Sequence, residues 1–155
     1  IVFITIVTQN RNPILINKID TLKHSINEVT RYHDFEIIAY VILNDHLHFL
    51  IKTQDITKYP KIIHSIKYNF TKNVGVATPT YNKLWQNRYW EHTIRDENDL
   101  YKHLDYIHYN SVKHYDIAPE EWKYSSFEKF VSLGYYEKDW CNFGDEHKIS
   151  ELNYE

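Results

Sequence analysis

The order in which strand-like and helix-like segments follow one another constrains the fold of this chain most strongly. β-Branched and aromatic residues gather in four short runs, which predict strands at residues 2–8, 35–43, 46–53 and 83–94. Helical spacing of apolar residues predicts one helix over about residues 14–32 and a second helix beginning near Pro60. The resulting order, β-α-β-β-α-β, is that of a split β-α-β or ferredoxin-like fold.

A ferredoxin-like fold packs two helices on one face of an antiparallel sheet and leaves the other face for a further helix or a ligand. Residues 96–113 predict this further helix, with Asp96 as its N-cap and an apolar stripe of Leu100, Leu104 and Ile107. A short C-terminal helix is expected from about residue 118, with Phe127, Phe130 and Val131 facing the core. We therefore expect an α+β protein with an additional helix and a C-terminal helical extension.

The length and composition are those of a folded protein rather than a disordered one. With 155 residues, 43% apolar and 25% charged, the chain suits one domain, with a core at 1–115 and an extension of it at 116–155. No apolar run is long enough to span a bilayer, so no membrane partner is expected. No secretory signal is recognisable, and we expect a few residues upstream because Ile1 is not an initiator methionine.

The single cysteine, Cys141, cannot form an internal disulfide. This favours a reducing compartment, most simply the cytoplasm. It also excludes a zinc site built from several cysteines.

Charge is distributed unevenly along the chain. The net charge of −3 argues mildly against a nucleic-acid partner, but residues 57–95 carry seven basic residues and one acid, a local net charge of +6. Residues 116–155 carry ten acids and four lysines, a local net charge of −6. The central segment is therefore able to face phosphates, although an ordinary solvated helix face explains the same pattern.

Two histidines stand in the third predicted strand. Because residues i and i+2 of a strand point to the same face, His46 and His48 lie side by side while Leu47 points into the core. Neutral imidazoles are common ligands of divalent metals, but two histidines on a polar strand face are also ordinary. A metal site needs further ligands, and Asp45 sits in the turn, where strand alternation predicts that it faces away.

The helix predicted at 96–113 carries a polar flank beside its apolar stripe. At about 100° per residue, His103, Tyr106, Asn110 and Lys113 lie together on this flank. Tyr106 and Asn110 are one turn apart, so one side chain sits above the other. The same pattern is expected if Tyr106 is an ordinary amphipathic tyrosine and Asn110 an ordinary residue near the helix end. A functional and a purely structural interpretation therefore both stay open.

Four longer motifs follow one another along the chain. They read NDHLHFLI at 44–51, WQNRYWEHTIRDENDL at 85–100, YIHYNSVKHY at 106–115 and EEWKYSSFEKFVSLGYY at 120–136. In order and spacing they resemble the REP-associated tyrosine transposases, which are single-tyrosine members of the HUH endonuclease superfamily. The resemblance covers nearly the whole chain, and four ordered motifs are far more specific than any one alone.

The resemblance implies metal-dependent cleavage and rejoining of single-stranded DNA, on hairpin-containing substrates, through a 5′-phosphotyrosine intermediate. It implies that Tyr106 is the nucleophile and that His46, His48 and Asn110 hold Mg²⁺ or Mn²⁺. The resemblance places Tyr106 and Asn110 in one active site, and helical spacing places them on one flank of the predicted helix, so the two arguments agree.

The chain departs from the family pattern at three positions. Asn44 and Ser111 each stand where the family usually has Pro, and Tyr115 stands where it has Gly. None of these changes removes a residue with an implied catalytic role. The last two affect where the helix ends, and hence how Tyr106 is aimed.

Single-stranded or hairpin DNA is the expected partner. Contacts to its phosphates are expected from Lys67, Lys72, Arg88, Arg95 and Lys113. His92 shares strand parity with Trp90 and is expected near the site as a further DNA-binding residue, although an ordinary polar strand residue explains it equally well.

Two other functions remain open at this point. A ferredoxin-like sheet also binds single-stranded nucleic acid through stacked aromatic residues, and such a domain binds DNA without a metal and leaves it uncut. A metal-dependent phosphodiesterase that uses water as its nucleophile cleaves DNA without forming a covalent adduct. The choice between a monomer and a homodimer is also open.

Overall fold

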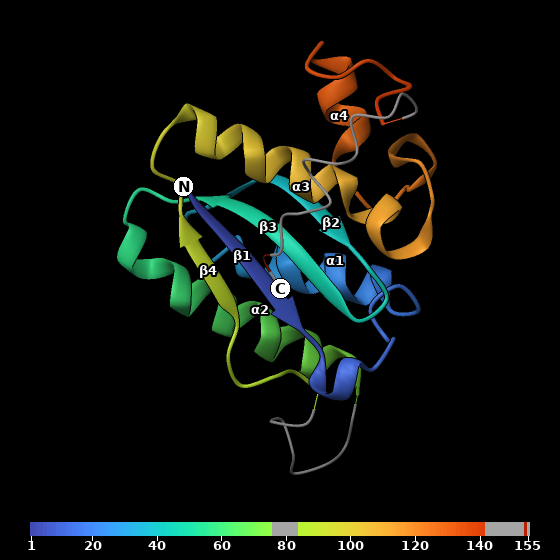
Figure 1. The fold of residues 1–155 in the computed structure, drawn as a ribbon. Coiled ribbons are helices and arrows are strands. Elements are labelled where there is room, and N and C mark those ends of the chain that lie inside the picture. The colour runs from blue at the N-terminus through green and yellow to red at the C-terminus, as the bar shows by residue number, and fades with distance from the viewer. Residues whose placement is uncertain (76–83, 142–153, 155) are drawn as a thin grey trace.

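The fold is a four-stranded antiparallel sheet with helices on both of its faces (Figure 1). The computed structural model describes residues 1–75, 84–141 and 154. The strands are β1 (Val2–Val7), β2 (Glu36–Ile42), β3 (His46–Lys52) and β4 (Trp90–Thr93), in the order β2-β3-β1-β4. Every neighbouring pair is antiparallel, so the predicted ferredoxin-like sheet is confirmed.

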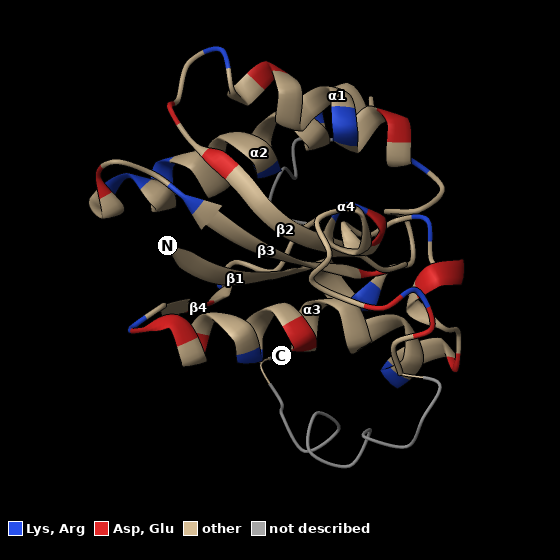
Figure 2. Ribbon diagram, turned by 90° about the horizontal axis from the view of Figure 1, so that it is seen from above, with Lys and Arg blue, Asp and Glu red and all other residues tan. Residues whose placement is uncertain are grey.

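Two helices cover one face of the sheet and a third helix covers the other (Figure 2). On the first face, α1 (Ile19–Val29) and α2 (Tyr59–Asn73) pack side by side, whereas α3 (Glu97–Tyr115) lies across the second face. Strand alternation sends Ile4 of β1 towards α1 and α2, and its neighbour Phe3 towards α3. Leu47 is fully buried on the first face, as predicted. Within these described ranges, no helix is both long and apolar enough to cross a membrane.

The first helix is shorter than its apolar pattern predicted. The prediction began at residue 14, but α1 begins at Ile19 because residues 15–18 form a turn. In that turn the Leu15 N–H donates to the carbonyl of Asn44 (2.9 Å), next to the β2–β3 hairpin. Leu15 is fully buried, so the segment joins the core without being helical.

The last strand is also shorter than the predicted 83–94. Regular pairing is confined to β4, since the residues before it make only an isolated bridge, from Trp85 to Thr8, and are also tied to α2. Trp85 Nε1–H donates to the carbonyl of Lys67 (3.1 Å), and Lys67 Nζ donates to the carbonyl of Gln86 (2.6 Å). The sequence VGVATPTYN at 74–82 predicts a loop, and this segment lies mostly outside the described residues, which resume at Leu84.

The predicted C-terminal helix is split in two. A 3₁₀ turn, η4 (Pro119–Glu121), precedes the short helix α4 (Phe127–Ser132). Between them the chain pairs with the edge of the sheet, through a single bridge from Ser125 to Val41 of β2. Phe127 and Phe130 are buried as predicted, whereas Val131 is only partly buried. The extension therefore packs on both α3 and β2.

A buried hydrogen-bonded chain connects α3 to this extension. Tyr136 Oη–H donates to Asp105 Oδ1 (2.8 Å), so its oxygen accepts from His108 Nδ1–H (3.3 Å). His108 Nε2 is hydrogen-bonded to the hydroxyl oxygen of Ser126 (2.8 Å). Burial lowers the pKa of His108 to about 3, so the ring is neutral in the folded protein.

This neutral ring predicts a loss of stability in acid. The unfolded chain binds a proton at His108 near pH 6.5, whereas the folded chain does not until about pH 3, so stability falls as the pH drops through this window. We expect His108 to lower the free energy of unfolding by about 2 kcal/mol between pH 7 and pH 5. Urea unfolding at both pH values measures it, with His108→Gln as the comparison. Equal losses in the wild-type chain and the variant would contradict this assignment.

Candidate active site

Both histidines of β3 are buried on the face that α3 covers. His46 and His48 are 1% and 0% exposed, and their ring centroids lie 5.2 Å apart. His46 Nδ1–H donates to Asp45 Oδ1 (2.6 Å). The Thr5 hydroxyl donates to the carbonyl of Tyr154 (2.7 Å), so His48 Nδ1–H donates to Thr5 Oγ1 (2.8 Å). Each imidazole therefore offers the lone pair of its Nε2 as a ligand atom.

The prediction that Asp45 faces away is wrong. The carbonyl of Asp45 accepts from the N–H and the hydroxyl of Thr8 (2.8 and 2.9 Å), which holds the turn so that the carboxylate reaches His46. Burial raises the pKa of the Asp45 carboxyl, but hydrogen bonds from His46 and Arg11 outweigh it and hold that pKa below its ordinary value. The ionised carboxylate orients the His46 ring, as carboxylates behind metal-binding histidines do.

The flank predicted on α3 meets these histidines. Tyr106 and Asn110 are fully buried, and the Tyr106 ring lies 5.2 Å from the ring of His48. Asn110 Nδ2–H donates to the carbonyl of Tyr106 (2.6 Å), which fixes the orientation of the amide. Burial lowers the pKa of His48 well below its ordinary value, and the Asn110 amide opposes this shift. The amide therefore lies beside a neutral imidazole.

Two buried polar atoms of this group point to a ligand. Across the part of the chain that the structure describes, His48 Nε2 and Asn110 Oδ1 make no hydrogen bond. Leaving such an atom buried and unpaired costs about 1–3 kcal/mol. Together with Nε2 of His46, these atoms form a set of two imidazole nitrogens and one amide oxygen, which suits a divalent metal ion. The residues present therefore fit a divalent metal.

The hydroxyl of Tyr106 lies among hydrogen-bond donors. Lys113 Nζ, one of the predicted flank residues, donates to Tyr106 Oη (3.3 Å) and lies 5.1 Å from the centre of its ring. The backbone N–H of Tyr154 also donates to Oη (3.4 Å), and the Tyr154 ring packs against Tyr106 at 4.8 Å. Positive charge beside a phenol oxygen stabilises the phenolate.

Two departures from the family pattern contact each other. α3 continues through Ser111 to Tyr115, and Asp116 closes it in the left-handed conformation. The hydroxyl of Tyr115 then accepts from the N–H of Asn44 (3.0 Å), at the start of the His46 motif. A Pro at 44 has no N–H and a Gly at 115 has no hydroxyl, so the two substitutions compensate for each other.

This contact predicts a coupling that a double-mutant cycle measures. Tyr115→Phe leaves the Asn44 N–H without its acceptor and is expected to lower the free energy of unfolding by about 1–2 kcal/mol. In an Asn44→Pro background the same change is expected to cost less, since no N–H remains to be satisfied. Urea unfolding of the wild-type chain, both single variants and the double variant gives the coupling energy. Additive effects would refute it.

Most of the predicted phosphate-binding residues lie away from these side chains. Lys67 and Lys72 are on α2, which covers the opposite face of the sheet (Figure 2). Arg88 and Arg95 are exposed, and they lie just before and just after β4 in the chain. Among the predicted residues, Lys113 contacts Tyr106, and the phosphate contacts expected of the others stay predictions.

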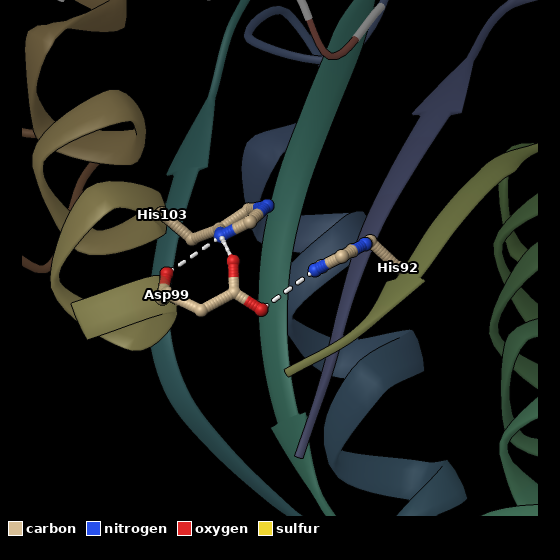
Figure 3. A group of neighbouring side chains, drawn as sticks. All are labelled: His92, Asp99 and His103. Atoms are coloured by element: carbon tan, nitrogen blue, oxygen red, sulfur yellow. Dashed lines mark hydrogen bonds and ion pairs between the residues drawn. The ribbon is translucent and has the colours of Figure 1, made fainter. Parts of the chain in front are cut away.

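His92 lies on the sheet face that α3 covers, but its hydrogen-bond partner is not one of the residues around His46 and His48. Its Nε2 bonds to Asp99 Oδ2 (2.7 Å), and Asp99 also contacts His103 (Figure 3). Asp99 was missed in the sequence reasoning. Its spacing of four residues from His103, on one helix face, was the available signal.

A histidine pair on one strand, facing a tyrosine on a helix, is the arrangement expected of a single-tyrosine transposase. The family model of IS200-like transposases matches residues 1–110, so the chain belongs to this family.

Two named relatives and one solved structure are similar over most of their length. A Haemophilus influenzae protein assigned as a REP-associated tyrosine transposase is 37% identical over 150 residues, covering 89% of this chain and 85% of the relative. The Escherichia coli REP-associated tyrosine transposase is 34% identical over 142 residues, covering 90% and 83%. A REP-associated tyrosine transposase solved bound to a REP hairpin superposes with a TM-score of 0.81 at 32% identity, covering 99% of this chain and 88% of that one.

Proposed function

We propose that this transposase cleaves and rejoins single-stranded DNA next to a hairpin, through a covalent bond to Tyr106. The observation that carries the proposal is that His46, His48, Asn110 and Tyr106 meet at one buried point between β3 and α3. A relative solved with a REP hairpin supports hairpin DNA as the substrate. All four residues come from one chain, which supports a site that is complete within a single subunit.

The proposed cofactor is Mg²⁺ or Mn²⁺, held by Nε2 of His46, Nε2 of His48 and Oδ1 of Asn110. When bound, such an ion supplies positive charge that polarises the scissile phosphate and offsets charge in the transition state. Asp45 and Thr5 hold the two rings in the tautomer that exposes Nε2. The Asn110 amide is oriented by its bond to the helix backbone.

In the proposed reaction the oxygen of Tyr106 bonds to phosphorus and the bond from phosphorus to the 3′ oxygen breaks. The phenol proton is lost and a proton ends on the 3′ oxygen, so the products are a 5′-phosphotyrosine and a free 3′-OH. Tyrosine ordinarily ionises near pH 10, and the Lys113 ammonium beside Oη stabilises the phenolate as it forms. Because one phosphodiester replaces another, a 3′-OH reverses the step and joins strands without an energy source.

Access and DNA binding complete the proposal. The Tyr106 ring is fully buried, so the residues that cover it, Tyr154 among them, must move before DNA reaches the hydroxyl. We propose that Lys67, Lys72, Arg88 and Arg95 contact backbone phosphates away from the reacting bond. We also propose that 116–155 belongs to the same domain as the core, which is supported by the packing of α4 on α3 and β2.

A denaturing gel tests this function against its two rivals. The full chain is incubated with a labelled single strand that contains a hairpin, with Mn²⁺ or with EDTA. The proposal expects a protein–DNA adduct that survives denaturation and requires Mn²⁺. A non-catalytic binding domain leaves the strand uncut, although it retards the strand on a native gel in EDTA. A phosphodiesterase that uses water cuts the strand without an adduct.

A further inference from the structure

A second group of metal-ligand side chains lies beside the proposed active site. His92 comes from β4, and Asp99 and His103 come from the first two turns of α3 (Figure 3). One ligand atom from each of the three lies within 4.8 Å of the other two. His92 Nε2 is 2.7 Å from Asp99 Oδ2, and His103 Nδ1 is 3.2 Å from Asp99 Oδ1.

This group is separate from the histidines of β3. The ring of Phe3 packs between them, with its centroid 5.5 Å from that of His48 and 4.8 Å from that of His103. The rings of His92 and His103 stack on each other at 4.8 Å with an interplanar angle of 12°. The two histidines therefore face the same carboxylate from two elements, with a buried aromatic ring behind them.

The protonation states of Asp99 and His103 are those that a metal needs. Burial raises the pKa of the Asp99 carboxyl, but hydrogen bonds from His92 and from the Arg95 N–H (3.0 Å) outweigh it and hold that pKa below its ordinary value. Burial lowers the pKa of His103. A carboxylate that stays ionised and an imidazole that stays neutral do not have to lose a proton before they bind a cation.

His103 also carries an unsatisfied ring nitrogen. Its Nδ1–H faces the carbonyl of Asp99 (2.8 Å) and the Asp99 carboxylate, both of which are acceptors. The lone pair of Nε2 is then buried, and among the described residues no group donates to it. A histidine with a purely structural role is expected to pair both of its nitrogens. A metal ion takes this lone pair directly, or binds Nδ1 after the proton has moved to Nε2.

An ion is able to reach this group from solvent. His103 is only 1% exposed, but the side chains of His92 and Asp99 are 22% and 19% exposed. Two imidazoles and one carboxylate are also the ligand set of a zinc site that keeps an open position for water or for an oxygen of a ligand.

We propose that His92, Asp99 and His103 form a second metal site, distinct from the one proposed at His46 and His48, for a transition-metal ion of the Zn²⁺ type. The bound ion joins β4 to the beginning of α3 and leaves its fourth position to water or a phosphate oxygen. Tyr106 follows His103 by one turn of the same helix, so the ion fixes the helix that carries the proposed nucleophile. This second site does not depend on the DNA chemistry proposed above.

Binding of Co²⁺ to the full-length chain tests the second site. Four-coordinate Co²⁺ absorbs visible light strongly, and native mass spectrometry counts the bound ions. His92→Gln is expected to bind one Co²⁺ fewer than the wild-type chain, to lose the visible bands and to bind Zn²⁺ more than about 100-fold more weakly at this site. His24→Gln is the matched control, because it removes an exposed histidine that lies 3.7 Å from Glu28 on α1. It is expected to bind as the wild-type chain does.

Equal numbers of bound Co²⁺ in the wild-type chain and a folded His92→Gln variant would overturn the proposal. Circular dichroism without metal checks that the variant is folded. A second measurement uses no substitution: crystals of the wild-type chain are soaked in Zn²⁺ and anomalous scattering is recorded at the zinc edge. A peak among the three side chains supports the site, and its absence there overturns the site.

Discussion

Tyr106→Phe is expected to lower the yield of covalent protein–DNA adduct by at least about 10⁴-fold, because it removes the atom that bonds to phosphorus. The substitution keeps the ring, which packs against Phe3 and His48 at 6.0 and 5.2 Å. It deletes only a hydroxyl whose partners include the Lys113 ammonium and the N–H of Tyr154. Folding and metal binding are therefore expected to stay close to those of the wild-type chain, while the adduct disappears.

The matched control for this experiment is Tyr101→Phe. Tyr101 lies on the same helix and is 38% exposed. Its hydroxyl donates to Glu97 and not to a group near His46 and His48. It is expected to form the adduct at the wild-type rate. Peptide mapping of the wild-type adduct by mass spectrometry should locate the nucleotide on Tyr106. An adduct that persists in Tyr106→Phe would mean that another residue is the nucleophile.

The fold was accessible from the sequence because it depends on local periodicity, whereas the roles of the proposed catalytic residues came from the family resemblance. Alternation along β3 places His46 and His48 on one face, and helical spacing places Tyr106 and Asn110 on one flank. The sheet order then brings that face and that flank together. Strand alternation and helical spacing repeat every two and every 3.6 residues, so both can be recognised within a short segment of sequence.

Features that depend on contacts between distant segments were not accessible in this way. Alternation says nothing about a turn, so the bond from His46 to Asp45 was missed. The late beginning of β4 goes with Lys67, which bonds to Gln86 and Trp85 from α2. Likewise, no local pattern shows that the hydroxyl of Tyr115 reaches the N–H of Asn44, because that contact spans 71 residues.

In the wild-type chain, Nε2 of His48 is buried and has no hydrogen-bond partner among the described residues. We therefore expect that replacing His48 raises the stability of the metal-free protein and lowers its activity. His48→Leu replaces the imidazole with an apolar side chain of similar size. Thr5 keeps its own acceptor, the carbonyl of Tyr154. Without metal, the variant is expected to be about 1 kcal/mol more stable than the wild-type chain, because position 48 then buries no unpaired ring nitrogen. With Mn²⁺, its rate of DNA cleavage is expected to fall by about 10³-fold or more.

Urea unfolding with EDTA and with Mn²⁺ separates the two effects. The wild-type chain is expected to gain stability when Mn²⁺ is added, because an ion that binds only the folded state stabilises it. His48→Leu is expected to gain little, since one of the three proposed ligand atoms is gone. His24→Leu, at an exposed position on α1, should match the wild-type chain in cleavage and in its response to Mn²⁺. If His48→Leu still cleaves DNA at the wild-type rate, His48 is not a ligand, and its unpaired nitrogen needs another explanation.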